Sequence, residues 1–311
     1  MRILVTGSSG FAGRHVIDEL RSAGHDPVRL DSRKSEHGGS EPEYIGDLRD
    51  ASFITETVER ENPDCCIHLG GIAFVPTGWS DPALVMSVNL NGTLNVLEAF
   101  RKTRPESRIL TVTSSEVYGR ESQGKPLEED DAMRPSNLYA VSKMAADLAT
   151  LLYAGQYGMH VMTARPQNHI GQGQSSRFVA TAFAEQLAEI AHGLREPVVR
   201  VGNLDSKRDF LDVRDVARAY RMIIELGSSG HAYNIASGKL VRISDILEIL
   251  SEHAGLQPRI ETDQDLYRPA DRPPLLSIEK IRRDTGWEPR IPIKETLKNI
   301  YDAALSGKAS T

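Results

Sequence analysis

A glycine-rich turn close to the N-terminus is the feature that most restricts what this chain can fold into. Three glycines, Gly7, Gly10 and Gly13, follow a strand-like run at Arg2–Thr6 and open a helical pattern at Phe11. Glycine permits positive φ and lets a ligand approach the backbone closely. The N–H groups at the start of the helix would then attract a phosphate. Strand, turn and helix in this order predict a dinucleotide-binding loop, although its spacing is G-x-x-G-x-x-G instead of G-x-G-x-x-G.

Strand-like and helical stretches alternate through the first two thirds of the chain. Further strands are predicted at Pro27–Leu30, Glu43–Ile45, Cys65–Leu69, Arg108–Val112 and His160–Ala164, and helices at Met86–Phe100 and Leu138–Tyr157. This alternation predicts parallel βαβ units with right-handed crossovers, and therefore a doubly wound, Rossmann-type α/β sheet. We expect a dinucleotide-binding domain over 1–165, to which 203–235 return. Residues 166–202 and 236–311 would form a smaller, partly interleaved C-terminal α/β substrate domain.

Composition and charge exclude several classes of protein. With 311 residues, of which 40% are hydrophobic, the chain can bury a sizeable core. The 37 basic and 43 acidic side chains are mixed along the chain, which argues against a nucleic-acid partner. No apolar run is long enough to span a membrane, and the start lacks a signal-peptide layout. The only cysteines, Cys65 and Cys66, are adjacent, and the nine histidines show no metal-ligand spacing. These features favour a soluble cytoplasmic protein without a metal.

The ends of the second and third predicted strands carry residues suited to the adenosine half of a dinucleotide. Asp31 would accept hydrogen bonds from a ribose and repel a 2′-phosphate, which favours NADH. Arg33, with Lys34 after it, could instead pair with that phosphate, which favours NADPH. Asp47 and Leu48 would hold the adenine edge. The expected cofactor is therefore NADPH or NADH.

A tyrosine and a lysine four residues apart form the candidate catalytic pair. Tyr139 and Lys143 project from one face of the predicted helix. An ammonium beside a phenol is expected to lower the phenol pKa from about 10 toward neutrality, so that it can exchange a proton with a substrate oxygen. Ser114 and Ser115 follow a parallel strand at its carboxyl end, where such sheets bind ligands.

At these residues the chain resembles the extended short-chain dehydrogenase/reductase family of nucleotide-sugar enzymes. The resemblance covers almost the whole chain and also rests on Asn89 and on Arg165-Pro166-x-Asn168. Outside the cofactor machinery, three stretches are most similar to the branch that reduces 4-keto GDP-sugars, namely Asn168–Gln174, Val201–Phe210 and Tyr267–Pro269. Gln167 stands where that branch usually has Phe, Gln172 where it has Pro, and Leu69-Gly70-Gly71 where Leu-Ala-Ala is common.

The resemblance implies reduction of GDP-4-keto-6-deoxy-D-mannose at C4 to GDP-D-rhamnose. Tyr139 would protonate O4, Ser114 would orient that oxygen, and Lys143 would position both phenol and cofactor. The implied catalytic residues are Ser114, Glu116, Tyr139 and Lys143. Cofactor-binding residues would be Gly7, Gly10, Phe11, Gly13, Asp31, Arg33, Asp47, Leu48, Leu69, Gly70, Gly71, Asn89, Tyr139 and Lys143. Substrate-binding residues would be Ser115, Asn168, Arg200, Arg208 and Arg268. The family also implies a homodimer through the helices at Met86–Phe100 and Leu138–Tyr157.

The sequence disfavours two other activities of the family and leaves two alternatives open. A 4,6-dehydratase uses a Thr-Asp-Glu trio, and Ser114-Ser115-Glu116 lacks the central acid. A 3,5-epimerase needs a cysteine near this strand, whereas both cysteines lie far upstream. A 4-epimerase or a decarboxylase with tightly bound NAD remains an alternative. A non-catalytic NAD(P)-binding regulator is a further one, which the intact Tyr139 and Lys143 disfavour.

Overall fold

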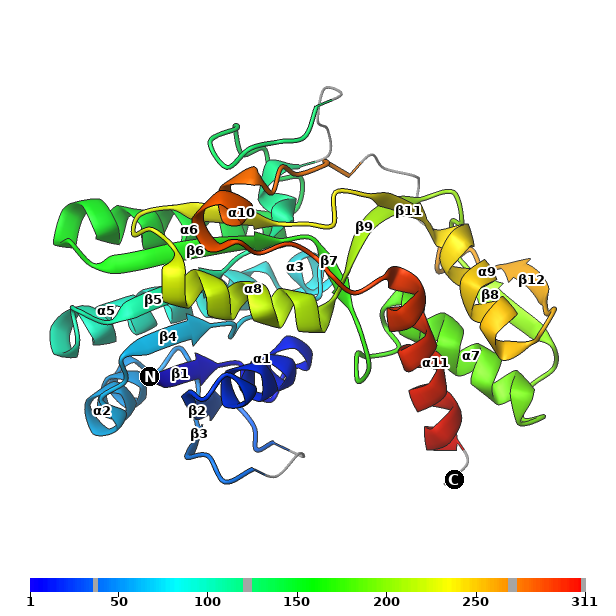
Figure 1. The fold of residues 1–311 in the computed structure, drawn as a ribbon, viewed down its shortest axis with the longest axis horizontal. Coiled ribbons are helices and arrows are strands. Elements are labelled where there is room, and N and C mark those ends of the chain that lie inside the picture. The colour runs from blue at the N-terminus through cyan, green and yellow to red at the C-terminus, as the bar shows by residue number, and fades with distance from the viewer. Residues whose placement is uncertain (36–38, 120–124, 268–272, 309–311) are drawn as a thin grey trace.

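A seven-stranded parallel sheet forms the larger part of the molecule (Figure 1). In this computed structural model, which describes residues 1–35, 39–119, 125–267 and 273–308, the strand order is β3-β2-β1-β4-β5-β6-β10. The strands are β1 (Arg2–Thr6), β2 (Asp26–Asp31), β3 (Glu43–Ile45), β4 (Cys65–His68), β5 (Arg108–Val112), β6 (His160–Pro166) and β10 (Ala232–Ile235). All neighbouring pairs are parallel. The predicted doubly wound α/β fold is confirmed.

Helices cover both faces of this sheet because its strands are apolar on both sides. Ile3 and Val5 of β1 pack into the core under α1 (Phe11–Ser22) and α8 (Val213–Leu226). Leu4, between them in sequence, points to the opposite core, under α2 (Ala51–Glu61) and α5 (Gly92–Thr103). Successive residues of a strand face opposite sides, so a continuous apolar run is buried on both. Beside α5 lies α6 (Leu138–Tyr157), with the bounds predicted for it.

A smaller unit at the carboxyl edge of the sheet contains two short sheets and three helices (Figure 1). One sheet joins β7 (Asn168–Ile170), β9 (Lys207–Asp212) and β11 (Leu240–Arg242); the other pairs β8 (Val198–Val201) with β12 (Arg259–Thr262). The helices α7 (Val179–Ala191), α9 (Ile243–Ala254) and α11 (Ile293–Lys308) bury Leu187, Ile246 and Leu297 in a separate core.

The packing of two segments bears on where the two proposed domains meet. Within 203–235, α8 and β10 lie on the large sheet, whereas β9 pairs in the small one. Further along, α10 (Glu279–Thr285) packs against α8 and β10, and Ile281 and Trp287 are buried in the core of the large sheet. We therefore propose that the segment containing α10 belongs to the cofactor domain, although the sequence predicted it within the substrate domain.

The predicted helix over Met86–Phe100 is divided into three consecutive pieces. These are α4 (Pro82–Met86), a π-helical turn η1 (Ser87–Asn91) and α5. Such π-helical turns are rare and occur frequently at functional sites. The turn contains Asn89, which is buried beside the candidate site. Two further short helices are the 3-10 helix η2 (Ser115–Tyr118), which lines that site, and α3 (Thr77–Ser80), which packs against the start of α6.

A buried ion pair ties α6 to the ends of β5 and β6. Arg165 donates to both carboxylate oxygens of Asp147 at 3.0 and 2.7 Å, and Thr113 donates to Asp147 at 2.9 Å. The side chains of Arg165 and Asp147 are 2% and 0% exposed. Asp147 lies one turn beyond Lys143 on α6, so this pair connects the candidate catalytic helix to the two strands that flank it.

Replacing Asp147 with Ala should destabilise the protein strongly, because the Arg165 charge would remain buried without its partner. We expect a loss of about 3–5 kcal/mol in unfolding free energy by urea denaturation. The matched control is Asp18→Ala, since Asp18 pairs with Arg21 on the exposed side of α1. That substitution should cost about 0–1 kcal/mol. Equal losses from the two variants would contradict the interpretation of the buried pair.

Candidate active site

One large cavity lies where the carboxyl ends of the sheet strands face the smaller unit. Its volume is about 1060 Å³, and residues from both parts of the chain line it. Open α/β sheets bind ligands at this edge, near the point where the strand order reverses between β1 and β4. The cavity wall contains nineteen of the twenty-one predicted site residues, namely Gly7, Gly10, Phe11, Gly13, Asp31, Arg33, Asp47, Leu48, Leu69, Gly70, Gly71, Ser114, Ser115, Glu116, Tyr139, Lys143, Asn168, Arg200 and Arg208.

The glycine loop packs too closely for side chains. Gly7 has φ +70°, and a Cβ on Gly13 would lie 2.2 Å from the Gly7 carbonyl oxygen. Gly10 is the N-cap of α1, and no side chain caps that helix end. The first turn of α1 contains no acidic side chain, so the helix N-terminus fits the diphosphate of a dinucleotide.

Both carboxylate oxygens of Asp31 accept hydrogen bonds from backbone N–H groups, and one of these groups lies in the glycine loop. One accepts from the Ser9 N–H at 2.9 Å and the other from the Ser32 N–H at 2.7 Å. The carboxylate is thus partly neutralised by backbone donors, while Arg33 lines the same part of the cavity. Asp47, in the loop after β3, pairs with Arg49, whose guanidinium holds the pKa of Asp47 below its usual range.

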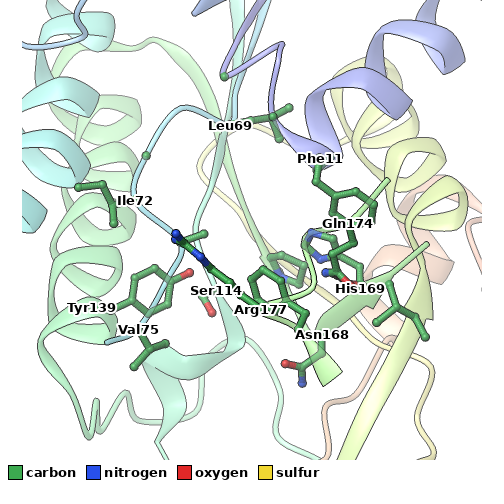
Figure 2. Close-up of a pocket in the computed structure, with 18 of the residues that line it drawn as sticks. Phe11, Leu69, Ile72, Val75, Ser114, Tyr139, Asn168, His169, Gln174 and Arg177 are labelled. Atoms are coloured by element: carbon green, nitrogen blue, oxygen red, sulfur yellow. Dashed lines mark hydrogen bonds between the residues drawn. The ribbon is translucent and has the colours of Figure 1, made fainter. Parts of the chain in front are cut away.

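Tyr139, Ser114 and Lys143 all line the cavity, and Figure 2 shows Tyr139 beside Ser114 on one wall. The expected lowering of the phenol pKa is wrong for this arrangement. Burial raises the pKa of Tyr139 to about 12, and the nearby Glu116 carboxylate adds to the increase, while a hydrogen bond with Ser114 opposes it. The Lys143 ammonium instead donates to the Val112 carbonyl at 3.0 Å. Tyr139 consequently keeps its proton over the physiological pH range.

Lys143 is buried in a closely packed part of the cavity wall. Burial lowers its pKa to about 8. A Cβ on Gly71 would approach Lys143 Nζ to 3.3 Å and Asn89 Oδ1 to 2.8 Å, so this glycine leaves room for both groups. Asn89 accepts from the Ile72 N–H at 2.7 Å and donates to the Ser142 hydroxyl at 2.9 Å. Unlike the other predicted cofactor residues, Asn89 does not line the cavity; it links the loop after β4 to α6.

Replacing Lys143 with Met should change how stability responds to pH. The side chain titrates near 10.5 in the unfolded chain and near 8 in the folded protein, so between these values the unfolded state binds more protons. Stability of the wild type then rises with pH. Relative to the Met variant, it should gain about 1.5 kcal/mol of unfolding free energy between about pH 8 and about pH 9.5. Urea denaturation at both values measures this, and parallel pH responses of the two proteins would contradict it.

The predicted substrate residues lie toward the smaller unit. Ser115 is buried at the start of η2, whereas Asn168 on β7 and Arg200 on β8 are exposed to the cavity. Arg208 on β9 lines the same wall. Glu116 accepts a hydrogen bond from Asn137, the N-cap of α6, at 3.2 Å. Arg268 lies outside the described residues.

Two contacts at the site, an aromatic stack and a cation–π pair, were not predicted from the sequence. The ring of His169 stacks on Phe11 with 6.0 Å between centroids, and burial lowers the His169 pKa. Arg177 lies over the Phe74 ring at 5.4 Å, joining the loop after β4 to the loop before α7. Figure 2 shows Phe11, His169 and Arg177 around the cavity. Each pair joins residues more than 100 positions apart, so no local sequence pattern would reveal it. In the part of the chain that the structure describes, no group of three or more potential metal ligands is present.

Comparisons with known proteins agree with this geometry. The profile of the family described as GDP-mannose 4,6 dehydratase matches residues 4–300. GDP-6-deoxy-D-mannose reductase of Pseudomonas aeruginosa is 37% identical over 301 residues, covering 96% of this chain and 95% of that protein. A solved structure of RMD from Pseudomonas aeruginosa with NADPH superposes with a TM-score of 0.88 at 35% identity, covering 98% of this chain and 99% of that one. UDP-glucose 4-epimerase of Thermus thermophilus with NAD gives a TM-score of 0.86 at 28% identity, with coverage of 98% and 99%.

Proposed function

Because this chain belongs to the GDP-mannose 4,6 dehydratase family of extended short-chain dehydrogenase/reductases, we propose that it is a 4-ketoreductase that converts GDP-4-keto-6-deoxy-D-mannose to GDP-D-rhamnose. The observation that carries the proposal is the row Ser114, Ser115 and Glu116 beside Tyr139. The central residue of this row, Ser115, has a hydroxyl in place of a carboxyl group. The site therefore has Tyr139 as a proton donor for a ketone, but it has no central acid for the elimination of water. The 37% identical reductase supports the same assignment.

In the proposed reaction, C4 gains a hydride and O4 gains a proton. A reduced nicotinamide supplies the hydride when it is bound. Tyr139 donates its phenolic proton to O4, which suits a phenol that burial keeps protonated. Ser114 accepts from the Glu116 N–H at 3.2 Å and hydrogen-bonds the Tyr139 phenol, so its hydroxyl can donate to O4 when the substrate enters between the two side chains. Its hydrogen bond to Tyr139 lowers the phenol pKa and thereby stabilises the phenolate that remains.

For the cofactor we propose NADPH, bound along the glycine loop and the end of β2. The backbone donors on the Asp31 carboxylate reduce its repulsion of a 2′-phosphate, and Arg33 is the cation nearest to it in sequence on the cavity wall. The relative solved with NADPH supports this choice. Lys143 would hold the nicotinamide ribose, and Asp47 with Leu48 would contact the adenine.

The direct test is to mix the protein with GDP-4-keto-6-deoxy-D-mannose and NADPH, then NADH, and follow the absorbance of the reduced nicotinamide. We expect stoichiometric consumption, a single product reduced at C4, and faster turnover with NADPH. If the cofactor binds but is not consumed, the proposal fails. UDP-glucose and UDP-glucuronic acid with NAD would then test the alternatives, a 4-epimerase and a decarboxylase.

We further propose a homodimer through α5 and α6. Three large apolar side chains of α6, Leu148, Leu152 and Tyr157, are 47%, 68% and 50% exposed, which is an unusual face for a helix to leave uncovered. Light scattering after gel filtration should give about twice the chain mass, and Leu152→Glu should shift the measured mass to that of the monomer.

No helix among the described residues is long and apolar enough to cross a membrane. The two cysteines are free and buried, which supports the proposed cytoplasmic location.

A further inference from the structure

A buried glutamine lies behind the serine pair of the proposed active site. Gln167 follows Pro166 at the end of β6 and is 4% exposed. Both ends of its amide are engaged, one by the Pro274 carbonyl and the other by the Ser115 hydroxyl.

The partners of this amide determine the direction of both hydrogen bonds. A backbone carbonyl only accepts, so the Gln167 NH2 group faces Pro274, at 2.8 Å. The amide oxygen therefore faces Ser115, at 3.1 Å. That oxygen also only accepts, so Ser115 uses its one hydroxyl proton for Gln167. Ser115 lines the cavity and presents only lone pairs to a ligand.

The adjacent serine has the opposite arrangement. Ser114 accepts from the Glu116 N–H at 3.2 Å and its other hydrogen bond is with the Tyr139 phenol, so its hydroxyl lies among the groups that would meet the substrate oxygen. Two neighbouring hydroxyls on the cavity wall thus have different roles, one as a donor and one as an acceptor. A ketone oxygen fits the donor, and a hydroxyl group on a carbon next to that ketone fits the acceptor.

We propose that Gln167 is a specificity-determining residue, which makes Ser115 an obligatory hydrogen-bond acceptor and so selects substrates with a hydroxyl group next to the ketone. The proposal rests on the proposed 4-ketoreductase function and names its substrate class more closely, as an α-hydroxy ketone. A substrate that lacks the neighbouring hydroxyl, or carries a second carbonyl there, leaves the buried Ser115 lone pairs without a donor.

The kinetic test is a double-mutant cycle with Gln167→Met and Ser115→Ala, read as kcat/KM for GDP-4-keto-6-deoxy-D-mannose and for its 3-keto analogue. The wild type should prefer the hydroxylated substrate by about 100-fold. With Met at 167, Ser115 regains a proton that it can donate to a carbonyl at C3, and this preference should fall to within about threefold. The double variant should behave like Ser115→Ala alone. Additive effects, or an unchanged preference in Gln167→Met, would overturn the proposal.

Gln174→Met is the matched control for this cycle. Gln174 lines the same cavity but donates to the His169 carbonyl at 3.0 Å. Whatever its effect on rate, this variant should leave the preference for the 3-hydroxyl unchanged. Thermal denaturation of each variant separates loss of folding from loss of specificity.

A measurement without substrate separates this inference from the proposed function. Neutron diffraction from perdeuterated crystals of the protein with NADPH should place the Ser115 deuteron between its oxygen and the Gln167 oxygen. A deuteron directed into the cavity would overturn the inference even if the ketone is reduced. Conversely, a chain that does not reduce the keto sugar but shows the deuteron on Gln167 would lose the proposed function and keep the hydrogen-bond direction.

Discussion

Replacing Tyr139 with Phe should lower kcat for reduction of the keto sugar by about 10³-fold, with cofactor affinity unchanged within about threefold. The phenol lines the cavity and can protonate O4, and its raised pKa keeps it protonated. The variant removes one oxygen from a side chain that is 7% exposed, so packing is nearly preserved. Stopped-flow absorbance measures the rate, and fluorescence titration with NADPH measures the affinity.

This variant also separates an enzyme from a regulator. A protein that only binds the cofactor would not depend on the phenol, so undiminished function in Tyr139→Phe would refute the catalytic assignment. Ser114→Ala is the companion variant. It removes the second hydrogen bond to O4 and should cost about 10–100-fold in kcat, less than the loss of the proton donor.

Replacing Gly13 with Ala should weaken NADPH binding by about 100-fold or more and lower the unfolding free energy by about 2–4 kcal/mol. An added Cβ would lie 2.2 Å from the Gly7 carbonyl oxygen and 2.7 Å from the Ser8 Cα. Both are backbone atoms of the loop itself, so no side chain can move aside to make room. The loop must shift away from the start of α1, and the diphosphate site shifts with it. Calorimetric titration and urea denaturation measure the two effects.

Gly155→Ala is the matched control because it adds the same methyl group in α6, where nothing lies within 4 Å of the new Cβ. There the substitution should stabilise the helix by about 0.5–1 kcal/mol and leave NADPH affinity unchanged. If both alanine variants bound NADPH like the wild type, close packing in the glycine loop would not be required for the cofactor site.

Most of the large sheet could be predicted from the sequence. The bounds of β1, β3, β5 and α6 agree with the predicted ranges, and β2, β4 and β6 differ only at their ends. Strands buried on both faces produce continuous apolar runs, and these alternate with helical patterns whose order requires a parallel sheet. The glycine loop could be predicted for a related reason. Its tight turn leaves no room for side chains, and this local requirement appears in the sequence as three glycines spaced three residues apart.

The chemistry of the site was decided by contacts between segments far apart in the chain. Spacing predicted that Tyr139 and Lys143 share a helix face, but whether the ammonium lowers the phenol pKa depends on burial and on the Val112 carbonyl, which comes from another strand. The link from Ser115 through Gln167 to Pro274 spans 159 positions and is likewise absent from any local pattern. Sequence periodicity reports the local backbone and which side of it is buried. Only the folded chain determines which polar groups meet in that interior, and desolvation together with those partners sets their proton affinity and hydrogen-bond direction.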